Sequence, residues 1–182
     1  NLHKMAFPVE PYQPAYYLRE YMRYTRDGTP GTIVVATNHL GRYSDFELSL
    51  EKVVAPQDTA LIRARGGSSA HNQNVGVQQR TGAWVWFIDD DHTFQPDVLM
   101  RLLDRKKDII APLCPMRFPP YNLVLYKRVD MTECAGKVTE FVEAFYSMAD
   151  LHGVRGLIQV QGLPKAGCLI RENVWAQMPM PV

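Results

Sequence analysis

A regular alternation of apolar β-branched runs and amphipathic helical stretches limits how this chain can fold. Thr32–Ala36 and Ala83–Ile88 are apolar runs of strand length, typical of strands that are buried on both faces of a sheet. Apolar residues at helical spacing follow each run, in residues 44–54 and after Pro96. Alternating strands and helices predict an α/β domain, with a mainly parallel sheet flanked by helices.

Apolar runs and their spacing also predict the other strands and helices of the chain. Two further strands are predicted at Thr59–Ala64 and Ile109–Ala111, with a helix over 70–80 between the second and third strands. Ser44 and Glu47 are spaced as a capping box for the first helix. After residue 112 the pattern is looser. The predictions are strands at 122–126 and 156–161, a strand or a helix at 137–145, and a helix at 171–178, with a short apolar run at 168–170.

The chain of 182 residues is long enough for one substantial core. Residues 1–31, rich in Tyr and Pro, are predicted to be an N-terminal arm with a short helix at about 15–24, and residues 32–182 to be the domain. The aromatic side chains of the arm suit either the surface of the domain or a protein partner. Because the chain lacks an initiator Met and has no obvious closing element, we expect it to be a segment of a longer protein.

Charge and cysteine content exclude some functions and favour one compartment. Lys and Arg number 20 against 19 Asp and Glu, a net charge of +1 that does not favour nucleic-acid binding. No apolar run is long enough to cross a bilayer. The three cysteines are widely spaced and form no CxxC pair, so we expect buried thiols and a cytoplasmic protein.

The chemistry is predicted to centre on three consecutive carboxylates, Asp89–Asp91, which follow directly after the apolar strand. Ligands of open α/β sheets bind at the carboxyl ends of the strands. Residues two apart share a face, so Asp89 and Asp91 could hold one Mg²⁺ or Mn²⁺ ion while Asp90 points elsewhere. The alternative is an acidic, solvated loop that caps the helix beginning near Pro96.

Other polar residues near predicted strand ends are weaker candidates. His92 and His39 could each contact a metal ion or a phosphate, or could face solvent. Gly66–Ser69 suggests either a phosphate-binding loop at a helix N-terminus or a simple connector. Arg117 and Tyr121 could reach a diphosphate or lie on the surface.

An Asp-X-Asp motif after an apolar strand resembles the GT-A glycosyltransferases, in particular their family-2-like branch. The opening strand that ends in Thr, Val34–Asn38, is similar to that of the family. Asn74, Gly82 and Phe87–Asp91 have a similar order and spacing, and Pro96–Leu99 resembles the helix after the motif. A later segment, Gly167–Arg171, resembles the family's glycine-containing segment near sugar and acceptor. The resemblance covers about residues 32–181 and is most specific from 74 to 103.

The resemblance implies a metal-dependent, hexosyltransferase-like enzyme that transfers a sugar from a nucleoside-diphosphate sugar to a hydroxyl of a glycan, a protein or another acceptor. It implies Mn²⁺ or Mg²⁺ at Asp89 and Asp91. The residues that it assigns to the nucleotide-sugar are Thr37, Asn38, Asn74, Asp89 and Asp90.

Two features differ from the family pattern. Gln73 precedes Asn74 where the family usually has Arg, and no Glu-Asp pair follows the Asp run. The catalytic base is therefore unassigned, and the family's acidic motif and late His would fall beyond Val182. Two alternatives stay open: a non-catalytic GT-A-like binding or assembly module, and a nucleotidyltransferase that uses the same carboxylates.

Overall fold

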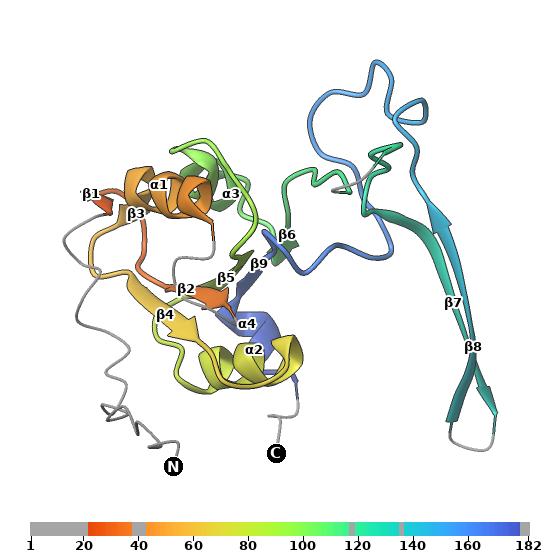
Figure 1. Ribbon diagram of the computed structural model, residues 1–182, viewed down its shortest axis with the longest axis horizontal. Coiled ribbons are helices and arrows are strands. Elements are labelled where there is room, and N and C mark those ends of the chain that lie inside the picture. Colours follow the sequence, from red (N-terminus) through yellow and green to blue (C-terminus); the bar gives the residue numbers. More distant parts are fainter. Residues whose placement is uncertain (1–21, 38–42, 117–118, 135–136, 179–182) are drawn as a thin grey trace, which may run out of the picture.

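A five-stranded sheet organises the computed structural model, which describes residues 22–37, 43–116, 119–134 and 137–178 (Figure 1). The strand order is β4-β2-β5-β9-β6. The strands are β4 (Ala60–Ala64), β2 (Thr32–Ala36), β5 (Trp84–Asp89), β9 (Leu169–Arg171) and β6 (Ile109–Ile110). β2 is parallel to both β4 and β5, whereas β9 is antiparallel to β5 and β6. The predicted mainly parallel sheet flanked by helices is confirmed.

Two layers of helices cover the sheet, as Figure 1 shows: α1 (Ser44–Lys52) and α3 (Val98–Asp104) lie on one side, α2 (Ser69–Gln78) and α4 (Glu172–Trp175) on the other. The larger core cluster lies on the side of α1 and α3 and contains Trp84 and Trp86, each 1 % exposed. The smaller cluster, on the side of α2, includes Val34, Val77 and Phe87. Alternation along β5 therefore sends its side chains into two different cores.

The parallel strands bring their carboxyl ends to one edge of the sheet. Ala36 pairs with Ala64 on one side and with Asp89 on the other. The turn before β9 reaches the same edge, since the Gly167 amide donates to the carbonyl of Phe87 at 2.7 Å. Residues that follow β2 and β5 are thereby placed beside the segment that leads into β9.

Residues 22–31 belong to the packed domain. Met22 is 6 % exposed within the larger core, and β1 (Arg23–Thr25) pairs in parallel with β3 (Val54–Pro56). The helix predicted up to about Tyr24 is therefore wrong at its C-terminal end, because backbone pairing with β3 holds these residues extended. The part of the predicted arm before residue 22 lies outside the described residues.

The predicted capping box at α1 is also wrong. Tyr43 occupies the N-cap position and caps with no side-chain hydrogen bond. Glu47 instead accepts two hydrogen bonds from Arg63 of β4, from Nη1 at 2.7 Å and from Nη2 at 2.5 Å. Leaving a buried guanidinium without a charged partner costs more free energy than leaving an exposed helix end without a side-chain cap. Glu47 therefore turns toward the sheet.

Beyond β6 the chain leaves the sheet. β7 (Tyr126–Cys134) and β8 (Lys137–Phe145) form an antiparallel ribbon that extends away from it, as Figure 1 shows. The ambiguous segment at 137–145 is thus a strand, and the strand predicted at 122–126 begins only at its last residue. Residues 156–161, predicted as a strand, form an irregular segment that meets a strand only at its end, where the Gln161 amide donates to the carbonyl of Tyr126 at 3.2 Å. The helix α4 is shorter than the predicted helix over 171–178.

Candidate functional site

The predicted carboxylates gather at the carboxyl end of β5. Asp89 is the last residue of the strand, and Asp91 and His92 lie in the turn that follows. One potential ligand atom from each of these three residues lies within 4.8 Å of the other two. Nδ1 of His92 is 2.8 Å from Oδ1 of Asp91. The chain thus brings together two hard oxygen donors and one imidazole nitrogen.

The donor set fits a small divalent cation. An octahedral Mg²⁺ ion takes ligands at about 2.0–2.1 Å, so that opposite ligands lie roughly 4 Å apart. The 2.8 Å between Nδ1 of His92 and Oδ1 of Asp91 suits two adjacent ligands of such an ion, and the Asp89 donor lies within 4.8 Å of both. Nδ1 of His92 is buried and makes no aligned hydrogen bond within the described part of the chain, although it is close to the Asp91 carboxylate. An ion between these donors would satisfy that nitrogen.

The charge on Asp89 is held in a partly dry environment. Burial raises the pKa of Asp89, and the neighbouring charge of Asp90 raises it further. His92 and Lys165 act in the opposite direction and lower the pKa of Asp89. Burial in turn lowers the pKa of Lys165, while the nearby Asp89 carboxylate raises it. A cation close to a carboxylate in this setting would stabilise its charged form.

Asp90 turns away from this cluster, as the alternation of side chains predicts. It is 8 % exposed, and its Oδ2 accepts a hydrogen bond of 2.5 Å from the hydroxyl of Thr37, which is 3 % exposed. The two predicted nucleotide contacts therefore bind each other across neighbouring strands. This pair fixes the end of β2 against the end of β5 and so orients the carboxylate turn.

Asn72 is a positioning residue that the sequence analysis missed. It is 1 % exposed, and its Nδ2 donates to the carbonyls of Thr37 and Gly67, both at 3.3 Å. Its Oδ1 accepts from the Gly67 amide at 3.1 Å. Asn72 thus ties the glycine-rich loop to the end of β2. The sequence signal for Asn72 is its position one turn into a helix that follows a Gly-Gly pair. The family resemblance points to Asn74 instead.

The other predicted site residues do not join the cluster of Asp89, Asp91 and His92 in the described part of the chain. Asn74 is exposed on α2, and Asn38, His39 and Arg117 lie outside the described residues. Within the predicted phosphate loop, the Ser68 hydroxyl accepts from the His71 amide at 3.2 Å and caps α2. Tyr121 is 54 % exposed. The structure therefore gathers the carboxylates and His92, but it does not bring Asn74 into their cluster.

The three consecutive carboxylates do not cap the helix that follows them, which was the alternative prediction. α3 begins at Val98, and its N-cap position is taken by Asp97. Asp97 makes an ion pair of 3.1 Å with Arg101 one turn along the same helix. The Asp run lies further back in the chain, beside the strand end and not at the helix N-terminus.

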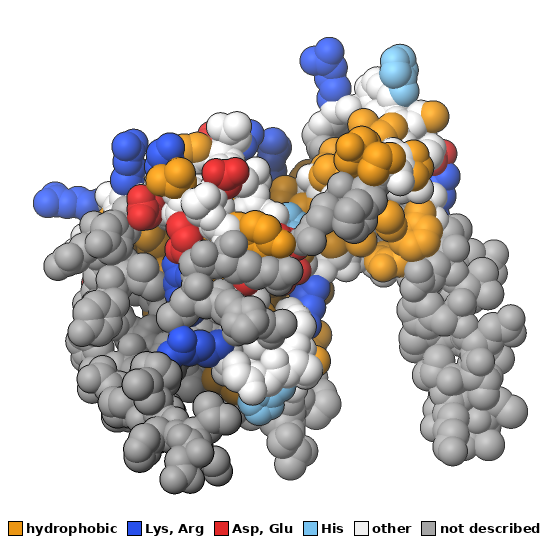
Figure 2. Space-filling model, in the orientation of Figure 1, with side chains coloured by type: hydrophobic (Ala, Val, Ile, Leu, Met, Phe, Trp, Pro, Cys, Tyr) orange, Lys and Arg blue, Asp and Glu red, His pale blue; other side chains and the backbone are white. Residues whose placement is uncertain are grey.

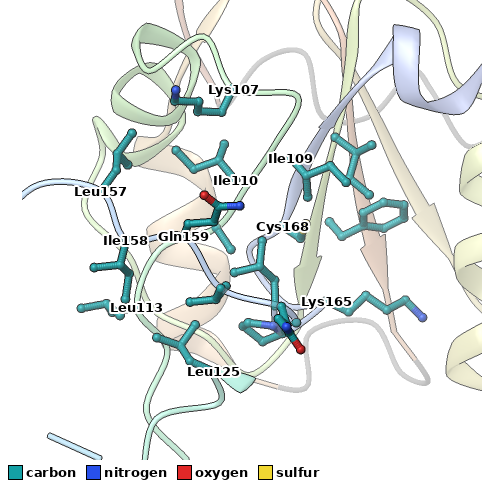
Figure 3. Close-up of a pocket in the computed structure, with 18 of the residues that line it drawn as sticks. Lys107, Ile109, Ile110, Leu113, Leu125, Leu157, Ile158, Gln159, Lys165 and Cys168 are labelled. Atoms are coloured by element: carbon teal, nitrogen blue, oxygen red, sulfur yellow. The ribbon is translucent and has the colours of Figure 1, made fainter. Parts of the chain in front are cut away.

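A large cavity lies on the side of the sheet that α2 covers (Figure 3). Its volume is about 1100 Å³, and it lies between the sheet, α2 and the irregular segment over 151–165. Phe87, two residues before Asp89 on β5, contributes to its wall, as does Lys165. Lys165, which interacts electrostatically with Asp89, therefore connects the cavity to the carboxylates.

The cysteines that the structure describes in full are structural. Cys114 and Cys168 are free and buried. Burial raises the pKa of Cys168 to about 11 and also raises the pKa of Cys114, with Asp89 adding to the second shift. Both side chains are therefore neutral thiols at neutral pH, as predicted for buried cysteines.

No helix in the described ranges is long and apolar enough to span a membrane. Comparison of the chain with protein-family models, with curated proteins and with solved structures found no match in any of the three.

Proposed function

We propose that this chain carries the donor-binding part of a metal-dependent glycosyltransferase. The observation that supports the proposal is the cluster of Asp89, Asp91 and His92 donor atoms within 4.8 Å at the carboxyl edge of a mainly parallel sheet. This edge is where open α/β sheets bind their ligands. The resemblance of the Asp-X-Asp segment to GT-A glycosyltransferases gives the cluster its proposed reaction.

Each residue has a distinct part in this proposal. Asp89 and Asp91 would hold Mn²⁺ or Mg²⁺, with His92 as a third ligand. When bound, the ion would stabilise the negative charge that develops on a leaving nucleoside diphosphate. Lys165 supplies further positive charge near Asp89. Asn38 and Asn74 stay predicted nucleotide-sugar contacts. Thr37 and Asp90, also predicted as contacts, are buried and hydrogen-bonded to each other, and would act indirectly by holding the two strand ends together.

The first test is metal binding. Mn²⁺ is titrated into the protein and followed by electron paramagnetic resonance, alone and with each common nucleoside diphosphate. We expect Asp91→Asn to weaken Mn²⁺ binding at least about tenfold, because loss of even an outer contact to a metal ligand has effects of that size. Asp97→Asn is the matched control, since Asp97 lies in the same connection but is paired with Arg101. Equal Mn²⁺ affinity in both variants would contradict the assignment.

The second test separates the reaction classes. If Mn²⁺ and a nucleoside diphosphate bind together at one site, the nucleotide raises the affinity for Mn²⁺, and Mn²⁺ raises the affinity for the nucleotide by the same factor. The protein is then incubated with a panel of hydroxyl acceptors, in one series with nucleoside-diphosphate sugars and in a separate series with nucleoside triphosphates. Release of nucleoside diphosphate supports glycosyl transfer, whereas release of pyrophosphate from nucleoside triphosphates supports a nucleotidyltransferase. Metal-dependent binding without either release by the full natural protein supports a non-catalytic module.

A further inference from the structure

Much of the apolar surface that the described chain exposes lies on the irregular segment over 146–165. Met148 is 64 % exposed, Val154 is 48 % exposed and Leu157 is 49 % exposed. Ile109 and Leu113 are exposed as well, and they line the same cavity as Val154 and Leu157. Figure 2 shows apolar side chains gathered over this part of the molecule, at the upper right. A large apolar patch on a protein surface marks a site of contact with another molecule.

The tip of this segment is a turn bounded by two glycines. Gly153 has a φ of 78° and Gly156 a φ of 89°, in the left-handed region that favours glycine. Apart from its chain neighbours, a Cβ atom added at either position would have no heavy atom within 4 Å, so the turn is open on both sides. Val154 and Arg155 lie between the glycines, both exposed, and Leu157 follows directly.

The charged side chains of the segment are cationic or already paired. Residues 151–165 contain one Arg, one Lys and no Asp or Glu. Asp150 comes just before them, and its Oδ1 lies 2.7 Å from Nζ of Lys127. The apolar tip therefore carries Arg155 with no carboxylate beside it in the sequence of the turn.

Further basic residues lie on the neighbouring part of the same surface. Figure 3 shows Lys107 on the same side of the cavity as Leu157. Residues 105–107, an Arg-Lys-Lys run, are all exposed. Asp108, which follows the run, accepts a hydrogen bond of 2.9 Å from Nδ2 of Asn173. In Figure 2, Lys or Arg side chains and a His side chain project at the edge of the apolar group.

This combination of exposed apolar side chains and cations suits a membrane better than a protein. In a twofold dimer the surface would meet itself, so that its cations would face their own copies. Lysine is depleted at the cores of interfaces with other proteins. At a membrane, apolar side chains enter the boundary between headgroups and acyl chains, while Lys and Arg reach the anionic headgroups.

We propose that the segment over 146–165 docks on the surface of a bilayer that contains anionic lipid. Val154 and Leu157 enter the interface from the tip of the segment, and Arg155 and Lys107 lie at the level of the lipid phosphates. Each part alone is weak, because a few apolar side chains and a few cations must act together to hold a domain on a membrane. The docking does not rest on the proposed function.

The test is co-sedimentation of the whole chain with lipid vesicles, without metal or nucleotide. The vesicles contain phosphatidylcholine alone or an equimolar mixture of phosphatidylcholine and phosphatidylglycerol. We expect the protein to bind the mixed vesicles more tightly than the neutral ones. This preference should diminish as salt is added, because salt screens the attraction between exposed charges.

Two variants test the two parts of the surface. Leu157→Asp is expected to weaken binding to the mixed vesicles about tenfold or more, because it replaces an apolar contact with an anion. Leu48→Asp is its matched control, since Leu48 is 50 % exposed on α1, away from the segment. Arg155→Glu should also weaken binding about tenfold or more, since each cation near an anionic bilayer strengthens binding roughly fivefold.

Arg26→Glu is the matched control for Arg155→Glu. It changes the net charge by the same amount, and Arg26 is exposed just after β1, which Figure 1 shows far from the segment over 146–165. All four substitutions are at exposed positions, so their thermal midpoints should stay close to that of the wild type. We expect both controls to bind the mixed vesicles as the wild type does, within about twofold.

Four results would overturn the inference. Failure of the wild type to bind mixed vesicles at low salt would remove the docking itself, and equal binding to neutral vesicles would remove the role of the cations. Equal weakening by each variant and its control would mean adsorption through overall charge or polarity. Sedimentation showing a wild-type dimer that Leu157→Asp dissociates would mean that a second copy covers this surface.

Discussion

The substitution Gly76→Ala tests how closely α2 must approach the sheet to hold the site together. Gly76 is buried in α2, and a Cβ atom there would lie 2.3 Å from Cγ1 and 2.9 Å from Cγ2 of Val34 on β2. Carbon atoms in contact normally lie about 3.5–4.0 Å apart. Val34 is fully buried, so either the helix moves away from the sheet by about 1 Å or Val34 leaves its rotamer.

Two effects of opposite sign set the magnitude. Alanine is favoured over glycine in a helix interior by about 0.8–1.0 kcal/mol. Forcing an extra methyl group into a packed core costs about 1–3 kcal/mol. The steric cost is expected to win because the atoms that the new methyl meets are themselves buried. The difference between the two effects is about 0–2 kcal/mol. Because the closest approach is only 2.3 Å, we expect Gly76→Ala to lower the free energy of unfolding by an amount near the upper limit, about 2 kcal/mol.

Gly67→Ala is the matched control. Its new Cβ would lie 2.4 Å from Cδ2 and 3.0 Å from Cβ of His71. His71 is exposed, so a change of its rotamer clears the ring, and the contact with its Cβ needs a shift of only a few tenths of an ångström. We expect a change within about 0.5 kcal/mol, as for most surface substitutions. Unfolding in urea, followed by tryptophan fluorescence, measures both variants, with the slope against denaturant checked for two-state behaviour.

A double-mutant cycle separates the steric contact from other effects. Val34→Ala removes both methyl groups that the new Cβ would meet, so in that background Gly76→Ala should be neutral or stabilising. We expect a coupling free energy of at least about 1 kcal/mol between the two positions. Gly76→Ala as stable as the wild type, or a coupling near zero, would refute the reasoning that this contact sets the position of α2.

The remaining predictions concern charge, hydrogen bonding and thiol reactivity. Because the folded protein raises the pKa of Asp89, its ionised form destabilises the metal-free fold above that pKa, and the penalty fades as the pH falls through it. Asp89→Asn should therefore unfold at a higher temperature than the wild type at about pH 7 and lose that advantage at about pH 4; a constant difference would contradict this. Trp86→Phe leaves the Gly167 carbonyl without its 3.0 Å hydrogen bond and should cost about 1–3 kcal/mol in urea unfolding, with an unchanged midpoint as the contrary result. Cys168, with a pKa of about 11, should be alkylated at least about tenfold more slowly in the native than in the urea-unfolded protein, as peptide mass spectrometry would show; equal rates would mean that the thiol is accessible.

Much of the sheet could be predicted from sequence because its strands are locally encoded. Thr32–Ala36 is β2 as predicted, and the predicted strand at Ala83–Ile88 differs from β5 by one residue at each end. Runs of apolar residues this long are stable only when both faces are covered, so strand position follows from composition alone. The segment over 156–161 also contains apolar residues, but they are interrupted by two glutamines. In the described chain only Gln161, at its end, hydrogen-bonds a strand, and the segment lines the cavity.

The carboxylate site was predictable only in part. Alternation along an extended chain separates Asp90 from Asp89 and Asp91, and the structure agrees, since Asp90 is buried against Thr37. The place of His92 in the cluster depends on the shape of the turn after β5, which no periodicity encodes.

Local sequence is enough to locate most strands of the sheet and the three carboxylates at the end of the central strand, because both depend on neighbours along the chain. Three features depend on tertiary packing: Asn72 ties the glycine-rich loop to β2, β9 enters the sheet antiparallel, and residues of α2, β6 and the segment over 151–165 line one cavity. These contacts join residues that are far apart in sequence. Their geometry is set by the packing of the helices on the sheet, to which no local pattern of residues corresponds.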